Sequence, residues 1–351
     1  MPQMTEALLK ELIYFGKNGP TDFFDSTPIE TIYFGGGTPS VLQVKALSQI
    51  IEVIQSNYVV TTNPEITLEA NPDDLTLVYC KQLREIGINR LSIGIQSFFE
   101  EHLKWMNRSH SAEQAKNCVP FALSAGINNI SVDLIYGFPG LSDNQWLSNL
   151  EVVNSMGVNH LSCYSLTVED RTPLKKLIDT KRYEAPSEDA SVKHFNMLMD
   201  FAGLNLWEHY EISNFCKNQH YSKHNTAYWQ QKKYLGIGPS AHSYNGVERR
   251  WNIRDNAAYI ESWENNTLAF EKEILSVKER VNDLILISLR TTWGLNTKVA
   301  SDILGQDFKE TRKLIVDKFV DLGLIQLDGI ILKLTNAGKH YADGIASEFF
   351  E

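Results

Sequence analysis

Phe34-Gly35-Gly36-Gly37-Thr38-Pro39-Ser40 is the stretch that decides the fold of this chain. It follows the short apolar run 31–34, which predicts a buried strand. Three consecutive glycines remove every side chain where this strand ends, so backbone amides can approach a ligand closely, and Thr38 adds a hydroxyl group. Pro39 prevents the strand from continuing. A tight turn explains the same glycines, so the interpretation depends on the strands that follow.

Strand-like and helix-like segments alternate five times from the N-terminus to residue 167. The expected strands are 31–34, 65–72, 90–96, 129–140 and 160–167, and the expected helices include 5–15, 44–58, 72–86 and 142–156. A loop is expected through 18–20. Such alternation predicts a parallel sheet with right-handed crossovers. A Rossmann fold is disfavoured because the glycines are contiguous and no G-x-G-x-x-G is present.

Each expected strand ends near a polar group: Gly37 with Thr38, Glu69, Gln96, Asp133 and Thr167. In a (β/α) barrel such strand ends converge on one face, where active sites form. Glu69 and Asp133 would suit an ammonium or sulfonium cation and ribose hydroxyls. Arg108, in a loop, can bind a carboxylate. The strand ends therefore predict a ligand that carries an amine, a carboxylate and a ribose.

Beyond residue 174 the alternation lapses, and 206–212 predicts one more strand. Aromatic residues and histidines are then dense through residue 244, including His224, Tyr228 and Trp229. A neutral imidazole flanked by flat rings would suit a haem group. A packed aromatic rim with a hydrogen-bonded histidine explains the same residues, and both interpretations stay open at this point.

Residues 276–351 predict a winged-helix-like domain. Helices are expected at 279–290 and 298–303, with an amphipathic helix at 308–321, and Asp328-Gly329 marks a hairpin turn. This part holds ten Lys and Arg against eleven Asp and Glu, so it has no basic footprint for nucleic acid. We expect a packing or lid domain.

Composition sets the remaining bounds. The chain has 351 residues, which predicts one large or two medium domains, and its net charge of −10 argues against nucleic acid as a partner. It shows neither a membrane-spanning apolar run nor a secretory signal, so we expect a cytoplasmic protein. The four cysteines, Cys80, Cys118, Cys163 and Cys216, are too far apart for a zinc or iron–sulfur motif.

Several motifs together resemble the radical SAM proteins of the oxygen-independent coproporphyrinogen III oxidase group. They are FGGGTPS at 34–40, LEANP at 68–72, GIQSF at 94–98, MNR at 106–108 and DLIYGFPG at 133–140. HNTAYW at 224–229 resembles the H-N-x-x-Y-W signature of the haem-chaperone branch of that group. The resemblance implies a partial (β/α) radical SAM barrel without its first strand, an α/β fold, followed by a mainly helical winged-helix-like domain. We divide the chain at 1–215, 216–275 and 276–351.

The resemblance also implies the site residues. Those for S-adenosylmethionine (SAM) are Gly36, Gly37, Thr38, Glu69, Gln96, Arg108, Asp133 and Thr167, of which Thr167 matches by strand position alone. The haem candidates are His224, Asn225, Tyr228 and Trp229.

One departure from the family is the absence of its C-x-x-x-C-x-x-C motif. The four cysteines do not replace it by spacing, so we expect no [4Fe–4S] ligands and no radical SAM catalysis in this polypeptide. The strand 31–34 would then be an unpaired edge that favours a dimer. An upstream start, a truncated gene and a degenerate homologue remain open.

Three functions are weighed on this basis. The preferred one is a haem-binding chaperone that hands haem to an acceptor protein or a membrane-associated respiratory enzyme. The second is an oxygen-independent coproporphyrinogen III oxidase, and the third is a non-catalytic scaffold that binds partners.

Overall fold

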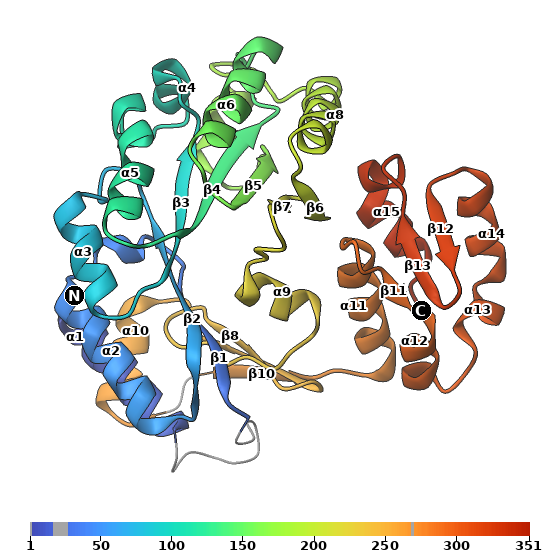
Figure 1. Ribbon diagram of the computed structural model, residues 1–351. Coiled ribbons are helices and arrows are strands. Elements are labelled where there is room, and N and C mark those ends of the chain that lie inside the picture. Colours follow the sequence, from blue (N-terminus) through green and yellow to red (C-terminus); the bar gives the residue numbers. More distant parts are fainter. Residues whose placement is uncertain (1, 17–26, 268–269) are drawn as a thin grey trace. The chain divides into compact units, whose positions relative to one another are not determined.

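A computed structural model describes residues 2–16, 27–267 and 270–351 (Figure 1). The loop expected through 18–20 lies outside the described residues. The chain forms two compact units. The first unit comprises the described residues of Met1–Ile32, Leu42–Pro64 and Lys223–Glu351, and the second comprises Tyr33–Val41 and Glu65–Ser222. Each unit is described by itself below.

A seven-stranded sheet runs in the order β1-β2-β3-β4-β5-β7-β6. Its strands are β1 (Ile29–Phe34), β2 (Val60–Ala70), β3 (Arg90–Gln96), β4 (Asn129–Tyr136), β5 (His160–Ser165), β6 (Glu208–Glu211) and β7 (Asn214–Cys216). The strands β2 to β5 pair in parallel, as the alternation predicts. The short strands β7 and β6 extend the sheet beyond β5 with antiparallel pairing. β7 was not expected from the sequence.

The helices of the second unit follow its strands. They are η1 (Pro39–Val41), α3 (Leu77–Glu85), α4 (Glu100–Trp105), α5 (Ala112–Ser124), α6 (Asp143–Ser155), α7 (Pro173–Asp179) and α8 (Glu188–Leu204). Capping boxes at Ser111 and Ser142 start α5 and α6. The helix expected from residue 72 begins at Leu77 instead, because the Thr76 hydroxyl caps it and residues 71–74 form a turn.

The parallel strands separate apolar from polar side chains, because successive residues of a strand point to opposite faces. Register places Leu68, Leu91 and Ile130 in one row, and all three are fully buried. The neighbouring row on the other face holds Glu69, Ser92, Ser131 and His160. We call this second face, with Asp133 and Ser162, the polar face. In Figure 1 the helices α3, α5 and α6 run along the strands of this sheet.

The first unit contains α1 (Pro2–Phe15), α2 (Val44–Asn57), α9 (Lys223–Trp229) and α10 (Asn256–Glu264). A three-stranded sheet joins β8 (His242–Tyr244), β9 (Glu248–Asn252) and β10 (Phe270–Ile274) in antiparallel pairs. Neither this sheet nor α10 was expected from the sequence. No helix among the described residues has the length and apolar character needed to cross a bilayer.

Residues 277 to 349 form a mainly helical part with a small sheet, as expected. The elements are α11 (Val277–Leu289), β11 (Leu295–Asn296), α12 (Thr297–Leu304), α13 (Phe308–Thr311), α14 (Lys313–Asp321), β12 (Ile325–Asp328), β13 (Ile331–Leu334), η2 (Gly338–Tyr341) and α15 (Ala342–Glu348). The hairpin turns at Gly329, whose φ of 59° suits glycine. The single helix expected at 308–321 is interrupted at Arg312, whose side chain binds the Phe349 carbonyl and the Glu351 carboxylate.

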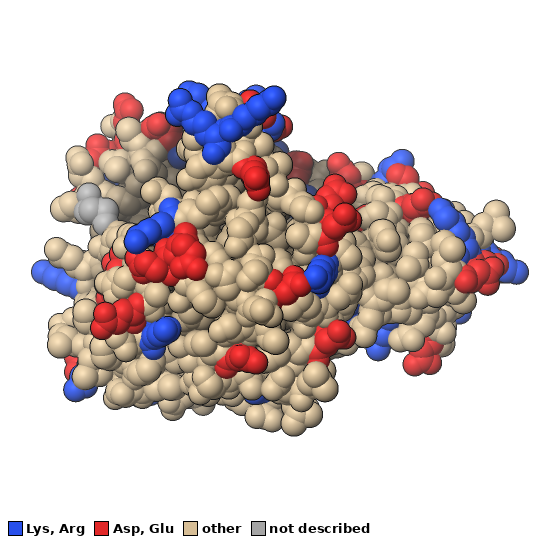
Figure 2. Space-filling view, turned by 90° about the horizontal axis from the view of Figure 1, so that it is seen from above, with Lys and Arg blue, Asp and Glu red and all other residues tan. Residues whose placement is uncertain are grey.

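Charged side chains of both signs are interspersed on the face shown in Figure 2, with a group of basic ones at its upper edge. The net charge of the chain is −10.

Glu11 is the buried polar centre of the first unit. Its carboxylate accepts hydrogen bonds from the Gly238 amide at 2.8 Å, from Asn252 Nδ2 at 2.7 Å and from the Tyr259 hydroxyl. Burial raises the pKa of Glu11, and the three hydrogen bonds partly offset this effect. Because these donors come from the loop before β8, from β9 and from α10, one carboxylate fixes three elements onto α1.

We predict that Glu11→Ala lowers the free energy of unfolding by about 3–5 kcal/mol, because three buried donors lose their acceptor. Urea denaturation followed by tryptophan fluorescence measures this loss. Glu6→Ala is the matched control, since Glu6 is exposed and forms an ion pair with Lys10, and we expect a change below about 0.5 kcal/mol. Equal losses in the two variants would contradict the role of Glu11.

Candidate functional site

The loop after β1 is shaped by a contact between Tyr33 and Glu69. The Tyr33 hydroxyl donates to Glu69 Oε1 at 2.7 Å. A Cβ on Gly35 would lie 2.7 Å from the Tyr33 ring and 3.1 Å from Glu69 Oε1, so only glycine fits beside this pair. Gly36, with φ +89°, and Gly37 have no heavy atom within 4 Å of a Cβ, so their backbone lies open. This loop therefore offers bare amides next to a carboxylate.

Ser40 holds the loop after β1 against the loop after β2. The buried Ser40 hydroxyl donates to Asp74 Oδ2 at 2.6 Å, and the Asn71 amide approaches the same hydroxyl at 3.4 Å. The Tyr79 hydroxyl donates to the Ser40 carbonyl at 3.0 Å. The strand ends of β1 and β2 are thereby fixed to each other.

Gln96 and Arg108 lie together beside Gly94. A Cβ on Gly94 would lie 2.9 Å from Gln96 Nε2 and 3.5 Å from Arg108 Nη2. Arg108 Nη2 donates to Asn71 Oδ1 at 2.6 Å, which joins this pair to the loop after β2. Two buried atoms, Gln96 Oε1 and Arg108 Nε, have no hydrogen-bond partner among the described residues. Unpaired buried polar atoms of this kind are ready for a polar ligand.

The backbone that carries Gln96 is strained, with a φ of 65°. A buried cluster behind it fixes this conformation. The Ser97 hydroxyl lies 2.9 Å from His102 Nδ1, and Asn149 Oδ1 accepts the Phe98 amide at 2.9 Å.

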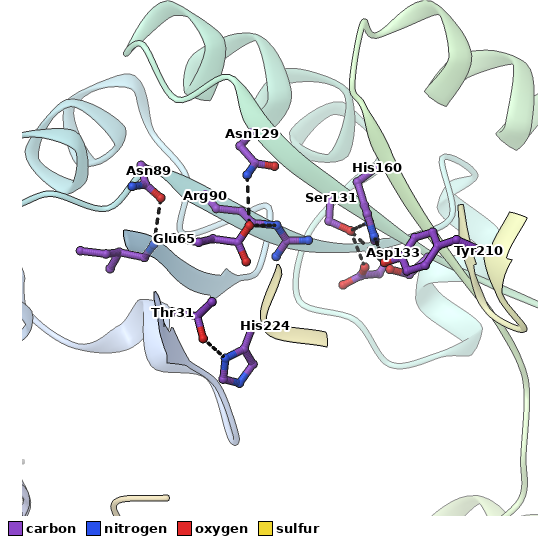
Figure 3. Close-up of polar contacts among 12 residues, drawn as sticks. Thr31, Glu65, Asn89, Arg90, Asn129, Ser131, Asp133, His160, Tyr210 and His224 are labelled. Carbon is purple, nitrogen blue, oxygen red and sulfur yellow. Dashed lines mark hydrogen bonds and ion pairs between the residues drawn. The ribbon is translucent and has the colours of Figure 1, made fainter. Parts of the chain in front are cut away.

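Asp133 lies on the polar face, beside Ser131 and His160 (Figure 3). The Ser92 hydroxyl approaches its two oxygens at 3.2 and 3.4 Å, and the Ser131 hydroxyl approaches Oδ1 at 3.4 Å. These bonds are long for a carboxylate, so its lone pairs are incompletely satisfied. Desolvation raises the pKa of Asp133 to about 6, and Glu69 adds to this rise, whereas Ser162 and Arg90 oppose it.

A second set of buried polar groups lies next to Asp133 on the polar face. His160 Nδ1 is 2.7 Å from the Ser131 hydroxyl, and His160 Nε2 is 2.6 Å from the Tyr210 hydroxyl. Arg90 is almost completely buried, and its Nε lies 4.0 Å from Glu65 Oε2 (Figure 3). We did not predict these residues as part of a site from the sequence. The signal that points to them is the period-two alternation of polar side chains in the strands.

Two of the residues expected at strand ends, Thr38 and Thr167, lie in the loops that follow their strands. Thr38 is partly buried, and its carbonyl accepts the Val41 amide at 3.2 Å as η1 begins. Thr167 is exposed, two residues after β5 ends. Glu69 lies near Asp133 on the polar face, and Gln96 lies near Arg108 beside Gly94.

The haem candidates lie on α9, in the first unit, and occupy two sides of that helix. His224 and Tyr228 are four residues apart and share one side. His224 Nδ1 is 2.8 Å from the Thr31 hydroxyl, as Figure 3 shows, and Nε2 is 3.2 Å from the Tyr228 hydroxyl. The Tyr228 ring is 40% exposed and meets the Tyr234 ring edge-on, with centroids 4.6 Å apart.

Asn225 and Trp229 occupy the adjacent side of α9. The Arg290 guanidinium lies over the Trp229 ring at 5.9 Å, and Trp229 lines a cavity of about 250 Å³ together with Leu284 and Trp293. Trp229 Nε1 is buried with no hydrogen-bond partner among the residues described. Trp229 therefore faces a different environment from His224.

The four cysteines lie on four separate elements, α3, α5, β5 and β7. All are buried free thiols, and burial raises the pKa of each. In the described part of the chain, no three His, Cys, Asp or Glu side chains are grouped to hold a metal ion.

We predict that Asp133→Asn raises stability at pH 7 but not at pH 4. A pKa raised from 3.8 to about 6 means that the folded state holds the proton more tightly than the unfolded state. Stability is therefore lost as pH rises from about 4 to 6, by up to about 3 kcal/mol, and asparagine does not titrate. Urea denaturation at both pH values measures the difference.

Asp143→Asn is the control of opposite sign, because hydrogen bonding to Lys193 lowers the pKa of Asp143. That variant should lose stability at pH 7. An Asp133→Asn protein no more stable than the parent at pH 7 would contradict the desolvated environment of Asp133.

Comparison with known proteins supports this architecture. Residues 22–153 match the family model described as "Radical SAM superfamily", and residues 275–340 match "HemN C-terminal domain". The heme chaperone HemW of Mycobacterium tuberculosis is 30% identical over 327 residues, which cover 92% of this chain and 80% of that protein. The heme chaperone HemW of Bacillus subtilis is 29% identical over 346 residues, which cover 98% of this chain and 90% of that protein.

Among solved structures, the coproporphyrinogen III oxidase HemN of Escherichia coli, described as a radical SAM enzyme, superimposes with a TM-score of 0.83. The match covers 99% of this chain and 83% of that one, at 19% sequence identity, and therefore shows a common fold. With these matches over most of its length, the chain belongs to the HemW family of radical SAM proteins.

Proposed function

We propose that this protein binds haem and hands it to an acceptor protein, on a scaffold that also binds SAM. The single observation that carries the haem part is the environment of His224 on α9. Its Nδ1 is hydrogen-bonded to the Thr31 hydroxyl at 2.8 Å, and its Nε2 lies 3.2 Å from the Tyr228 hydroxyl. The heme-chaperone relatives support the same assignment.

The chemistry of this imidazole suits an iron ligand. A metal-binding histidine usually donates its second N–H to an oxygen acceptor, which fixes the ring and its tautomer. Thr31 provides such an acceptor for Nδ1–H, which leaves Nε2 with the lone pair. The bond from Nε2 to the Tyr228 hydroxyl is long, at 3.2 Å, so iron can replace it at small cost.

Several aromatic rings lie beside His224, and each offers an apolar face. Tyr228 and Tyr234 pack edge to face, and the Tyr234 ring also contacts the Tyr244 ring, with centroids 6.1 Å apart. Desolvation raises the pKa of Tyr228 to about 12, so its hydroxyl stays neutral. A porphyrin face can stack on such rings. We assign Asn225 and Trp229 to the same haem region as a weaker part of the proposal, because they lie on the adjacent side of α9.

The donor set of the second unit fits SAM. The open backbone at Gly36 and Gly37, with Thr38, would bind the methionine part. Gln96 Oε1 and Arg108 Nε are buried without partners among the described residues, so they await polar groups of a ligand. Glu69 and Asp133 make this face acidic and would bind the ammonium group and ribose hydroxyls, and Thr167 would lie at the margin.

The cysteines do not fit a [4Fe–4S] cluster. Such a cluster needs thiolates that converge within one loop or cleft. Here each thiol is buried on a different element with a raised pKa, which keeps it protonated. The proposed haem and SAM binding does not depend on that cluster.

An oxygen-independent coproporphyrinogen III oxidase is the second candidate. The fold shared with HemN favours it, but that likeness concerns the fold alone. A partner-binding scaffold is the third. We also keep as proposals a cytoplasmic location, a membrane-associated respiratory enzyme among the acceptors, a dimer through the sheet edge at β1, and the division at 1–215, 216–275 and 276–351.

We predict that His224→Ala lowers haem affinity at least about tenfold and shifts the Soret band, because the iron loses its nitrogen ligand. Spectrophotometric titration with haem measures both. His220→Ala is the matched control, since His220 is exposed and bonded through Nδ1 to the Lys217 carbonyl. Haem binding that is unchanged in His224→Ala, or equally weakened in both variants, would contradict the assignment.

We predict that Gly37→Ala keeps the stability of the parent but weakens SAM binding about tenfold or more, because a methyl group enters the open space above the loop. Equilibrium dialysis with labelled SAM measures the affinity. Gly203→Ala, on α8 with open space around its Cβ, is the control and should bind like the parent. Equal affinity in Gly37→Ala would show that SAM does not contact this loop.

A further inference from the structure

A continuous line of hydrogen bonds leads from β6 across β5 to Asp133 on β4 (Figure 3). The Tyr210 hydroxyl is 2.6 Å from His160 Nε2, His160 Nδ1 is 2.7 Å from Ser131 Oγ, and Ser131 Oγ is 3.4 Å from Asp133 Oδ1. Tyr210, His160 and Ser131 are fully buried. We call these three residues and Asp133 the Tyr210–Asp133 chain.

His160 is neutral within this chain. Desolvation lowers its pKa well below the ordinary value, and the nearby Arg90 charge acts in the same direction. A neutral imidazole has one N–H donor and one nitrogen acceptor. Its two hydrogen bonds must therefore run in the same direction along the chain.

The tyrosine end sets that direction. The main chain of Ser222 bonds to the Tyr210 hydroxyl in the sense that lowers its pKa, as an N–H donor does. The phenol oxygen thus already accepts a hydrogen bond, and its own hydrogen is directed to His160 Nε2. The imidazole proton then resides on Nδ1 and is donated to Ser131 Oγ. The hydrogen of Ser131 is left to point onward, at Asp133 Oδ1 or at Ser162 Oγ, which is 3.3 Å away.

The charges around Asp133 favour the first of these two acceptors. The titratable groups that face it are Tyr33 on β1, Glu69 on β2, Arg90 on β3, and Cys163 and Tyr164 on β5. Arg90 is the cation among them, and it stabilises the ionised carboxylate. A charged acceptor binds a hydroxyl hydrogen more strongly than a neutral serine does. Ser162 is itself a hydrogen-bond donor, because its side-chain hydrogen bond to Asp133 lowers the pKa of that carboxyl and its hydroxyl also lies 3.1 Å from Asn214 Oδ1.

We propose that Tyr210 and His160 are positioning residues for Asp133, acting through Ser131. The chain holds the Ser131 hydrogen toward the carboxylate and so keeps Asp133 oriented and ionised as an acceptor for the hydroxyl groups of a bound ligand. The identity of that ligand as a ribose rests on the function proposed above. The Tyr210–Asp133 chain does not depend on that function. Each hydrogen bond polarises the next, so the Tyr210 hydroxyl influences the Asp133 carboxylate through the two residues between them, His160 and Ser131.

The chain also explains why a carboxylate with long hydrogen bonds remains useful on a buried face. Its partners leave part of each oxygen unsatisfied, and the ligand hydroxyls would complete the set. If the imidazole proton lay on Nε2, Ser131 would donate to His160 instead, and Asp133 would lose that donor.

The test is NMR of the ligand-free full chain, with ¹⁵N in histidine side chains and ¹³C in aspartate carboxyls. Spectra of His160→Gln and Asp133→Asn assign the two signals. We expect a neutral His160 with its proton on Nδ1 across the range in which Asp133 titrates. A proton on Nε2, or a charged imidazole, would overturn the proposal.

Variants test the coupling along the chain. We expect Tyr210→Phe to raise the midpoint of the Asp133 titration by about half a pH unit, and Ser131→Ala to raise it further. Tyr58→Phe is the matched control, because it removes a hydroxyl that donates to the Leu12 carbonyl at 2.7 Å and is not a member of the Tyr210–Asp133 chain. It should leave the midpoint in place.

An unchanged midpoint in Tyr210→Phe would also overturn the proposal. If that variant does not fold, the imidazole tautomer of the parent protein and the midpoint of Ser131→Ala still decide it. No measurement here uses SAM or haem. A failure of SAM or haem to bind would therefore contradict the proposed function but not the role of the Tyr210–Asp133 chain. Conversely, a wrong tautomer or an unchanged midpoint would contradict that role but not the proposed function.

Discussion

The period-two alternation of β2 to β5 is the constraint on which the rest of this structure depends. Parallel strands are usually apolar on both faces. Here one face carries fully buried leucines and isoleucines, while the other carries Glu69, Ser92, Ser131, Asp133 and His160 in register. A slip of one residue in any pairing would turn a carboxylate toward the apolar face. The same register that folds the sheet therefore also assembles the site.

The polar face carries more negative than positive charge. Among the described residues, Glu65, Glu69 and Asp133 lie near one buried arginine, Arg90. Such burial costs free energy unless partners compensate, and the long bonds to Asp133 show that compensation is incomplete. A sulfonium or ammonium ligand would supply the missing positive charge. In the first unit, Glu11 has a different environment, because three neutral donors bind its carboxylate and give it a structural role.

Much of the fold could be predicted from local sequence signals. The bounds of β3 were predicted as Arg90 to Gln96, since a glycine turn precedes an apolar run, and Ser142 marked the start of α6. The sheet of β8, β9 and β10 could not be predicted, because its strands have three to five residues and β10 pairs with β9 across α10. HNTAYW was noted for its residue types, but nothing local showed that its histidine and tryptophan lie on different sides of a helix.

The site shows the same division. The positions of Glu69 and Gln96 at the ends of parallel strands could be predicted, whereas Asp133 lies inside β4, three residues before its end. Ser131 and Tyr210 could not be predicted, because their contacts with His160 depend on register and on the return of β6, which are tertiary properties.

We infer that the loops after β1, β2 and β3 form one ligand-binding surface with Asp133. Hydrogen–deuterium exchange of the full chain with and without SAM measures whether these loops bind one ligand together. We expect slower exchange at 35–38, 69–74 and 94–97 together, with α13 and α14 unchanged. Exchange that is unaltered in all three loops, or slowed in only one of them, would contradict a shared surface.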